Sequence, residues 1–140
     1  MHKIQWISKE ELSIIIPLLK LLNDSSANEA VLEQRLEEMK NNNYQCVGVF
    51  EDNRLIGICG AWVLHKHYVG KHIELDNVMI LPEYRGKGIG EEMIAWLETW
   101  AKEQGCVAGE LNCYVQNSAG LKFWLNQGYR VLGFHCQKKW

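Results

Sequence analysis

The chain has 140 residues, of which 47% are hydrophobic and 23% are charged, and its formal net charge is −2. This composition excludes a disordered chain, and the charge excludes a polycation built for nucleic acid. No apolar run reaches the roughly 18 residues of a membrane span, and the first residues lack the apolar core of a secretory signal. We therefore expect one cytoplasmic domain, residues 1–140, without a nucleic-acid or membrane partner.

The cysteines favour neither a disulfide framework nor a zinc site. Their number, five, is odd, and no two are spaced as CxxC. Four of them lie in segments typical of strands, so we expect reduced thiols that pack in the core. His65 and His67 could ligate a metal, but the sequence offers no third ligand beside them. We expect no metal site.

The first third of the chain predicts one strand and two helices. Residues 3–7 alternate in polarity as a short strand does. Ser8 with Glu11, and Ser26 with Glu29, have the spacing of capping boxes ahead of helical apolar stripes. Pro17 lies within the first stripe, which predicts a kink there or a later helix start.

From residue 44 the pattern changes to that of an α+β sheet protein. Residues 44–51, 54–64 and 72–80 predict three consecutive antiparallel strands. After them come a helix that ends at Gly105, a strand over residues 107–114 with a bulge at Gly109, and a short helix over residues 117–128. Residues 129–140 supply one or two closing strands. The expected fold is a central mixed, mostly antiparallel sheet of about six to seven strands, flanked by about four helices.

Three glycines alternate with two cations just before the central helix. Gly86, Gly88 and Gly90 stand with Arg85 and Lys87 in "YRGKGIG". A helix N-terminus offers unpaired N–H groups to an anion, and glycines let the backbone approach it closely. The spacing fits neither a P-loop nor a dinucleotide fingerprint. A phosphate or pyrophosphate site is therefore indicated, and a tight turn without ligand remains the alternative.

This loop and a second segment resemble the GNAT superfamily of acetyl-CoA-dependent N-acetyltransferases. Arg85, Gly88 and Gly90 fill the family's [QR]-x-x-G-x-[GA] motif. "NSAGLKFWLNQGYRVLGF" is similar to its N-x-x-A-x-x-F-Y-x-x-x-G-F helix, with Gly120 where alanine is more common. The element order also matches along nearly the whole chain. The resemblance implies a GNAT-like fold and acetyl-CoA as the acyl donor.

The resemblance also implies which residues bind that donor. Backbone groups of residues 78–80 would pair with the pantetheine arm as an added strand does. The N–H groups from residue 85 or 86 through residue 91 would surround the pyrophosphate. The implied cofactor-binding residues are Val78, Met79, Ile80, Arg85, Gly86, Lys87, Gly88, Ile89, Gly90, Glu91, Asn117 and Trp124.

The catalytic residues are less closely matched. Trp124 stands where the family usually carries a tyrosine acid, and an indole N–H has no usable acidity near neutral pH. Tyr114 is the nearest candidate to replace this acid. The alternative role for Trp124 is structural, as an aromatic side chain that packs beside the cofactor. The thiolate could also leave unprotonated or through water, or the chain could lack catalysis. Glu74 and Asp76, two residues apart and so on one face of a strand, are the candidates for a base or an amine-orienting group.

The function that the resemblance implies is direct acetyl transfer to a primary amine. The acceptor would be a small molecule such as a polyamine, or a peptide or protein amine. The alternative is a non-catalytic CoA-binding or regulatory module. Four glutamates in the second helix, Glu29, Glu33, Glu37 and Glu38, would suit a cationic acceptor, although such a row is also common on a solvated helix face. Members of the family commonly dimerise, so the resemblance also allows a homodimer.

Overall fold

The computed structural model describes residues 2–22 and 27–140. Strands β1 (Lys3–Trp6), β2 (Gln45–Glu51), β3 (Arg54–Lys66), β4 (Gly70–Ile80) and β5 (Ala108–Leu111) form one sheet in the order β1-β2-β3-β4-β5. The first four strands pair antiparallel, and β4 pairs with β5 in parallel. The mixed, mostly antiparallel sheet of the sequence analysis is confirmed.

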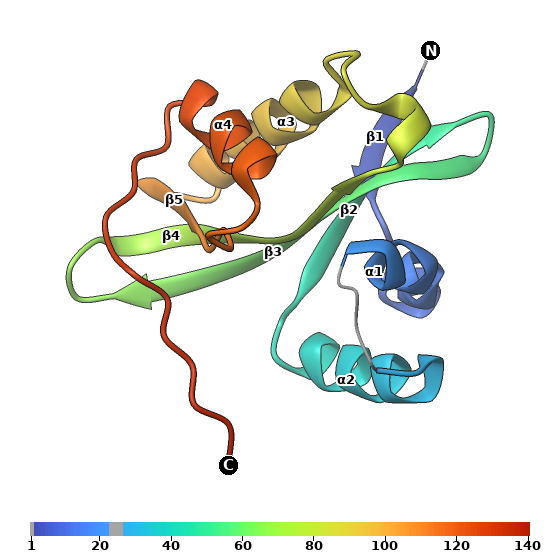
Figure 1. Cartoon of the computed structure of the whole chain (residues 1–140), viewed down its shortest axis with the longest axis horizontal. Helices are drawn as coiled ribbons and strands as arrows, with labels where there is room; N and C mark the ends of the chain where they lie inside the picture. Colours follow the sequence, from blue (N-terminus) through green and yellow to red (C-terminus); the bar gives the residue numbers. More distant parts are fainter. Residues whose placement is uncertain (1, 23–26) are drawn as a thin grey trace.

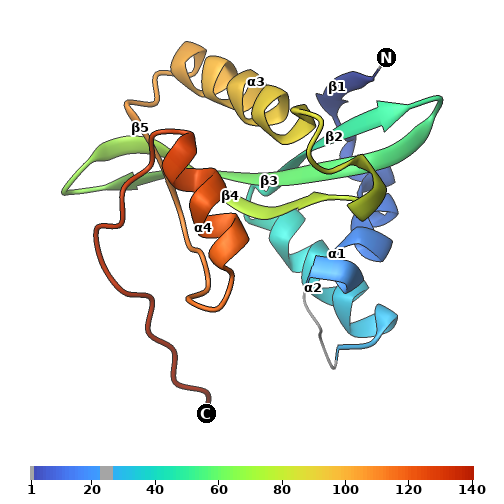
Figure 2. The same ribbon diagram turned by 45° about the horizontal axis from the view of Figure 1, so that its top comes forward.

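Helices cover both faces of this sheet (Figures 1 and 2). The 3₁₀ helix η1 (Lys9–Ile15), α1 (Ile16–Leu22) and α2 (Glu29–Asn41) lie against one face, and α3 (Ile89–Glu103) and α4 (Ser118–Asn126) lie against the other. A short 3₁₀ helix, η2 (Pro82–Tyr84), follows β4. No helix in the described ranges has the length and apolar character needed to cross a bilayer.

The first helix begins later than its sequence signal, as Pro17 predicted. A 3₁₀ helix follows Ser8, whose side chain makes no cap bond, and the α-helix starts only at Ile16. Pro17 thus lies in the first turn of the α-helix. N–H groups in this turn have no intrahelical acceptor, so the N–H that proline lacks is not needed there. The second predicted cap, Ser26, lies outside the described residues. The observed cap of α2 is Asn28, whose Oδ1 accepts a bond from the N–H of Val31 at 2.9 Å.

The core lies between the sheet and its helices. Met93, Ile94 and Leu97 of α3 are fully buried against it. All five cysteines are free, and Cys46, Cys59 and Cys106 are buried as the sequence predicted. The prediction of a core position is wrong for Cys136, which is exposed because residues 130–140 pair with no strand. Burial raises the pKa of the Cys46 thiol to about 12, so that thiol is a packing group at neutral pH.

The sheet has five strands, and the predicted count of six to seven is wrong. The closing strand is missing because residues 130–140 make no hydrogen bond to any other described residue, and a strand exists only with a partner. The predicted bulge at Gly109 is also wrong, since its pairing with Ile73 is in regular register. The absent side chain instead leaves room for Tyr129, whose hydroxyl would lie 2.8 Å from a Cβ at this position.

Candidate active site

The central feature of the site is the point where β4 and β5 part. They pair over residues 72–75 and 108–111, and beyond Leu75 β4 is paired with β3 alone within the described part of the chain. Residues 76–80 therefore present one backbone edge without a strand beside it. Such an edge offers N–H and C=O groups to an extended ligand.

A bulge interrupts β4 just after this point. Gly60 of β3 lies opposite Asp76 and Ile58 lies opposite Met79, so Asn77 and Val78 together face one residue of β3. Asn77 has a φ of +51°, in the left-handed region that asparagine tolerates better than most residues. A bulge bends its strand and redirects the backbone groups beside it. The bulge therefore sets the direction of the free edge.

Four side chains hold this bulge in a hydrogen-bonded cluster, which we call the bulge network: Tyr44, Trp62, Asp76 and Asn77. Asp76 accepts from the backbone N–H of Asn77 through Oδ1 at 2.9 Å and from the indole N–H of Trp62 through Oδ2 at 3.1 Å. The Tyr44 hydroxyl donates to Oδ1 of Asn77 at 3.0 Å. Both carboxylate oxygens of Asp76 are therefore engaged.

Tyr44 is the buried end of the network. Its side chain is fully buried, and its ring lies 5.0 Å from that of Trp62. The hydroxyl packs over Gly60, where a Cβ would collide with it. Burial first, and then the neighbouring Cys46, raises the pKa of Tyr44 well above its ordinary value. The hydroxyl thus remains a donor throughout the neutral range.

The glycine loop lies at the end of the free edge. Gly86 and Gly88 have φ values of +75° and +81°, and a Cβ at either would meet no atom within 4 Å. A side chain at either position would therefore point into open space. Gly88 is the N-cap of α3 and lacks a side chain to cap it. Arg85 joins the loop to β4, because its Nε donates to the carbonyl of Ile80 at 2.8 Å.

The third glycine has a different role. A Cβ at Gly90 would lie 3.3 Å from Cε1 of Phe123 and 3.9 Å from Cγ1 of Ile80. The start of α3, the end of β4 and the middle of α4 therefore meet at this point. The two segments that carry the family resemblance are brought together here.

The start of α4 explains one departure from the family motif. Asn117 caps the helix, with its Oδ1 accepting from the N–H of Gly120 at 2.9 Å. A Cβ at Gly120 would collide with the Asn117 amide, so glycine at this position accommodates the cap. Trp124 is buried in the same helix, edge-on to Phe123 at 5.0 Å and to Tyr129 at 5.3 Å.

The other predicted residues lie in less defined surroundings. Tyr114 follows the end of β5 and its side chain is 63% exposed. Glu74 lies one residue pair before Asp76, with its Oε2 3.9 Å from Nζ of Lys66. In α2, Glu29 pairs with a lysine of α1 at 3.1 Å and Glu37 with Lys40 at 2.8 Å. Two of the four predicted glutamates are thus partly neutralised by nearby cations.

Sequence reasoning missed three members of the bulge network: Tyr44, Trp62 and Asn77. The tyrosine and the tryptophan had no distinguishing signal, because aromatic residues in strands are usual core residues. Asn77 had one, since asparagine is depleted in strands and tolerates positive φ, so its place inside a strand pattern indicates a bulge.

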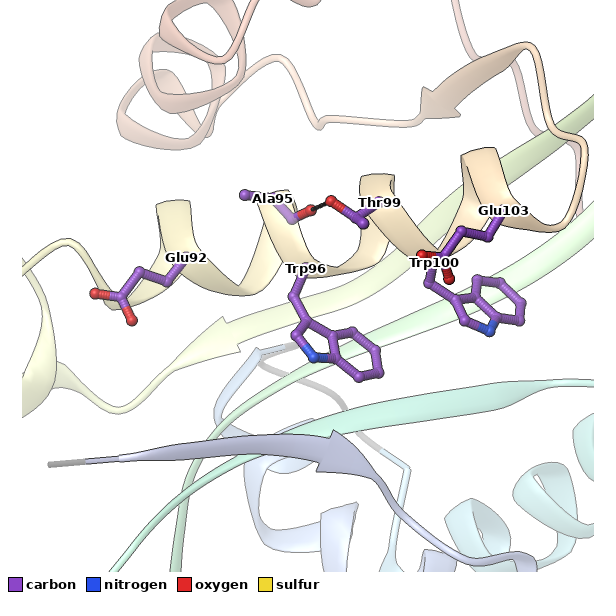
Figure 3. A pocket seen from close by; sticks show the side chains of 6 residues that line it. All are labelled: Glu92, Ala95, Trp96, Thr99, Trp100 and Glu103. Carbon is purple, nitrogen blue, oxygen red and sulfur yellow. Dashed lines mark hydrogen bonds between the residues drawn. The ribbon is translucent and has the colours of Figure 1, made fainter.

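A separate hollow of about 540 Å³ lies along α3 (Figure 3). It is lined by Glu92, Ala95, Trp96, Thr99, Trp100 and Glu103. Trp96 and Trp100 point from α3 toward β1, where both pack edge-on against Trp6. None of the predicted site residues lines this hollow.

Comparison with known proteins identifies the family. The model of the Acetyltransferase (GNAT) family matches residues 7–129. An aminoalkylphosphonate N-acetyltransferase of Salmonella typhimurium is 30% identical over 53% of the chain and 48% of its own length. A spermidine N(1)-acetyltransferase of Thermoplasma acidophilum is 26% identical over 79% of the chain and 65% of its own length. The chain thus spans between about half and two thirds of these two relatives.

A solved structure agrees with the fold. The aminoglycoside N-acetyltransferase AAC(6')-Iy, in complex with CoA, superposes with a TM-score of 0.85 at 18% identity, over 99% of this chain and 94% of that one. This likeness extends over the sheet and helices that build the site. Since the family model covers most of its length, the chain belongs to the Acetyltransferase (GNAT) family.

Proposed function

We propose that this chain transfers the acetyl group of acetyl-CoA to a primary amine by direct attack. The observation that carries the proposal is the continuity of the free edge of β4 with the glycine loop. The edge begins where β5 departs after Leu75, and Arg85 ties its last residue to the loop at the start of α3. A strip of peptide groups that leads to the N-terminus of a helix suits an amide-bearing arm attached to a pyrophosphate.

The residues present fit that donor. No atom lies within 4 Å of a Cβ built at Gly86 or Gly88, and α3 has no side chain that caps its first N–H groups. Residues 78–80 would pair with the pantetheine arm, and residues 85–91 would hold the pyrophosphate. Asn117 and Trp124 would border the thioester end from α4. Bound there, acetyl-CoA supplies an activated acetyl thioester.

The chain's own groups would then prepare the acceptor. An amine must be neutral to attack, so a carboxylate nearby has to take its proton or orient it. Asp76 already accepts two hydrogen bonds, which favours orientation of the amine and of the bulge over free proton transfer. Glu74 is the second candidate base. The N–H of Val78 or Met79 would polarise the acyl carbonyl. Tyr114, in the exposed segment after β5, would donate a proton to the departing thiolate.

The relatives support an amine acceptor without defining which one. Their names specify an aminoalkylphosphonate and spermidine, and a further relative from Acinetobacter baumannii is an aminoglycoside N(6')-acetyltransferase. We therefore propose a primary amine of a small molecule, or of a peptide, as the substrate class.

One observation favours the second candidate, a non-catalytic CoA-binding module. Trp124 occupies the position of the usual tyrosine acid and is buried between Phe123 and Tyr129. If no other group replaces that tyrosine, the donor would bind and remain intact.

A turnover assay separates the two candidates. The chain is incubated with acetyl-CoA and a panel of amines that includes spermidine, an aminoalkylphosphonate, an aminoglycoside and a lysine-containing peptide. Acetylated product is detected by mass spectrometry, because Cys136 is exposed and would disturb a thiol-release assay. Product with any amine supports transfer. Thermal stabilisation by CoA without acetylated product supports the binding module. If the chain shows no product and no stabilisation, both candidate functions are rejected.

A further inference from the structure

Two carboxylates stand opposite each other on β4 and β5, just before these strands part. Glu74 is paired with Glu110 in the parallel register, so both side chains leave the same face of the sheet. Asp76, two residues after Glu74, faces the same way. The side chain of Glu74 is 25% exposed and that of Glu110 is 24% exposed. Solvent therefore reaches the pair, which lies beside the start of the free edge of β4.

The fold supplies little positive charge to this pair. Like charges directly opposite each other in a sheet destabilise it. Nζ of Lys66 lies 3.9 Å from Oε2 of Glu74, which is beyond hydrogen-bond range. No lysine or arginine in the described ranges forms an ion pair with Glu110. Its Oε1 accepts a bond from the hydroxyl of Tyr68 at 2.6 Å, and that donor is neutral.

A buried histidine lies behind Glu110. The side chain of His72 is fully buried, and its Nδ1 lies 3.0 Å from the carbonyl oxygen of Gly70. Because a carbonyl only accepts, Nδ1 carries the proton, and in the neutral ring Nε2 presents a lone pair. Nε2 lies 3.6 Å from Oε1 of Glu110 and has no hydrogen-bond partner among the described residues. A cation bound at Glu110 would compensate the carboxylate that this lone pair faces.

The same face carries an aromatic ring that suits an organic cation. Trp62 lies opposite Glu74 on β3, and its indole N–H donates to Asp76. The ring is half-buried, so part of it is accessible. Aromatic faces attract ammonium groups, and carboxylates beside them add a full negative charge.

This face is opposite to the one that α4 covers. A Cβ at Gly109, whose neighbour Glu110 points the other way, would meet Tyr129, and Tyr129 packs on Trp124 of α4. In both views α1 and α2 lie toward the other end of the sheet, away from the turn between β3 and β4 (Figures 1 and 2). An acceptor on the carboxylate face would thus approach the gap between β4 and β5 from the side opposite to α4.

We propose that Glu74 and Glu110 bind a second ammonium group of the amine acceptor, which makes the substrate class a small organic dication. This inference rests on the proposed acetyl transfer and adds Glu110 as a specificity-determining residue. A strand rises about 3.3 Å per residue, so the pair lies about 7 Å along β4 from Asp76. An aliphatic diamine such as putrescine has about this span between its nitrogens, so one amine can lie at Asp76 while the other binds the pair.

The first test compares three acceptors of similar length: putrescine, n-butylamine and γ-aminobutyrate. They share the reacting amine, and their far ends are cationic, apolar and anionic. With product measured by mass spectrometry, kcat/KM should be about 10- to 100-fold higher for putrescine than for n-butylamine, because hydrogen bonds between charged groups contribute on that scale. γ-Aminobutyrate should give the lowest value. Equal values for putrescine and n-butylamine would overturn the proposal.

Glu110→Gln tests the pair without changing the candidate base Glu74. Glutamine keeps an oxygen for Tyr68 and removes the charge opposite Glu74, so the melting temperature should not fall. The kcat/KM for putrescine should fall about tenfold through KM, while that for n-butylamine stays within about twofold. Glu103→Gln, which changes an exposed glutamate of α3, is the matched control and should alter neither value. Equal losses for both amines in Glu110→Gln would reject the subsite.

Calorimetry separates this inference from the proposed reaction. Putrescine is titrated into the full chain saturated with CoA, which carries no acetyl group to transfer. Binding that Glu110→Gln weakens about tenfold, with no acetylation of any amine, would reject acetyl transfer and retain the cation subsite. Acetylation of all three amines with equal efficiency would retain transfer and reject the subsite. Absence of putrescine binding together with absence of a putrescine preference would also reject it.

Discussion

The two halves of β4 belong to one strand but differ in what surrounds them. Residues 72–75 pair with β3 on one edge and β5 on the other, and His72, Ile73 and Leu75 are buried. Residues 76–80 pair on one edge and carry the bulge network. In the first half both edges are paired within the sheet. In the second half the fold leaves an edge open and holds its shape with side chains. The proposed ligand site lies where pairing with β5 stops.

The largest expected effect is a loss of CoA affinity on substitution of Gly88 but not of Gly70, two glycines with similar backbone conformations. Gly88 and Gly70, at opposite ends of this region, have φ values of +81° and +82° and open space around them. Valine at either position strains the backbone by about 1–2 kcal/mol. At Gly88 it would also disturb the N–H groups that we propose bind the pyrophosphate, each worth about 1.5–3 kcal/mol. Gly88→Val should therefore lower CoA affinity at least about 100-fold in calorimetry.

Gly70→Val is the matched control. It should lower the melting temperature about as much as Gly88→Val does and leave CoA affinity unchanged, because the turn between β3 and β4 lies at the closed end of the strand. Equal losses of affinity in the two variants would show that strain alone, and not the loop, accounts for the effect.

The next prediction concerns the closed half. Ile73 is 2% exposed and lies between Val63 and Gly109 in the sheet. Ile73→Ala should lower the free energy of unfolding by about 2–5 kcal/mol, since it leaves a cavity. Ile73→Val should cost about 0.5–1.5 kcal/mol. Both variants should keep the wild-type kcat/KM well below their melting temperatures. A fall in kcat/KM that follows the loss of stability would contradict the division of β4 into two halves.

The same division explains which features the sequence could predict. Hydrophobic periodicity predicted β4 and α3, because burial imposes it on every residue of those elements. The glycine loop was predicted because positive φ and close approach demand one residue type. The bulge network was not predicted from the sequence, because Tyr44 and Asn77 are 33 positions apart and their contact depends on how β2, β3 and β4 align. The closing strand was predicted from an alternating pattern, but residues 130–140 form no strand, since a pattern does not specify a partner.

A third prediction addresses the carboxylate in the open half. Asp76→Asn offers one oxygen to two donors, so one bond of the network is lost and no base remains at this position. We expect kcat to fall by about 10- to 100-fold, with CoA affinity retained. Trp62→Phe removes one donor and should have a smaller effect of the same kind.

A double-mutant cycle tests whether these two residues act together. Because Trp62 and Asp76 belong to one network, the losses should be less than additive. Glu74→Gln is the comparison variant, since its carboxylate has only a 3.9 Å contact with Lys66 among the ion pairs found. If Glu74→Gln lowered kcat and Asp76→Asn did not, Glu74 would be the base and the network would only support the fold.

The smallest expected effect is that of Tyr44→Phe, which removes one buried donor at the far end of the network. Asn77 would lose its partner at 3.0 Å, which should cost about 0.5–1.5 kcal/mol of stability. The bulge would then be held less firmly, so kcat should fall a few-fold. Tyr68→Phe also removes a single hydroxyl bond, to Glu110 beside the closed half, and should leave kcat unchanged.

The pH dependence of this last effect identifies its origin. Burial raises the folded-state pKa of Tyr44, so its contribution to stability is complete below the ordinary value of 10.0 and falls as the pH rises above it, when only the unfolded chain ionises. The difference in unfolding free energy between wild type and Tyr44→Phe should therefore be constant from about pH 6 to 9 and shrink above about pH 10. A difference that varies near neutrality would mean that another group of the open half titrates, and the bulge would then depend on charge as well as on the buried hydroxyl.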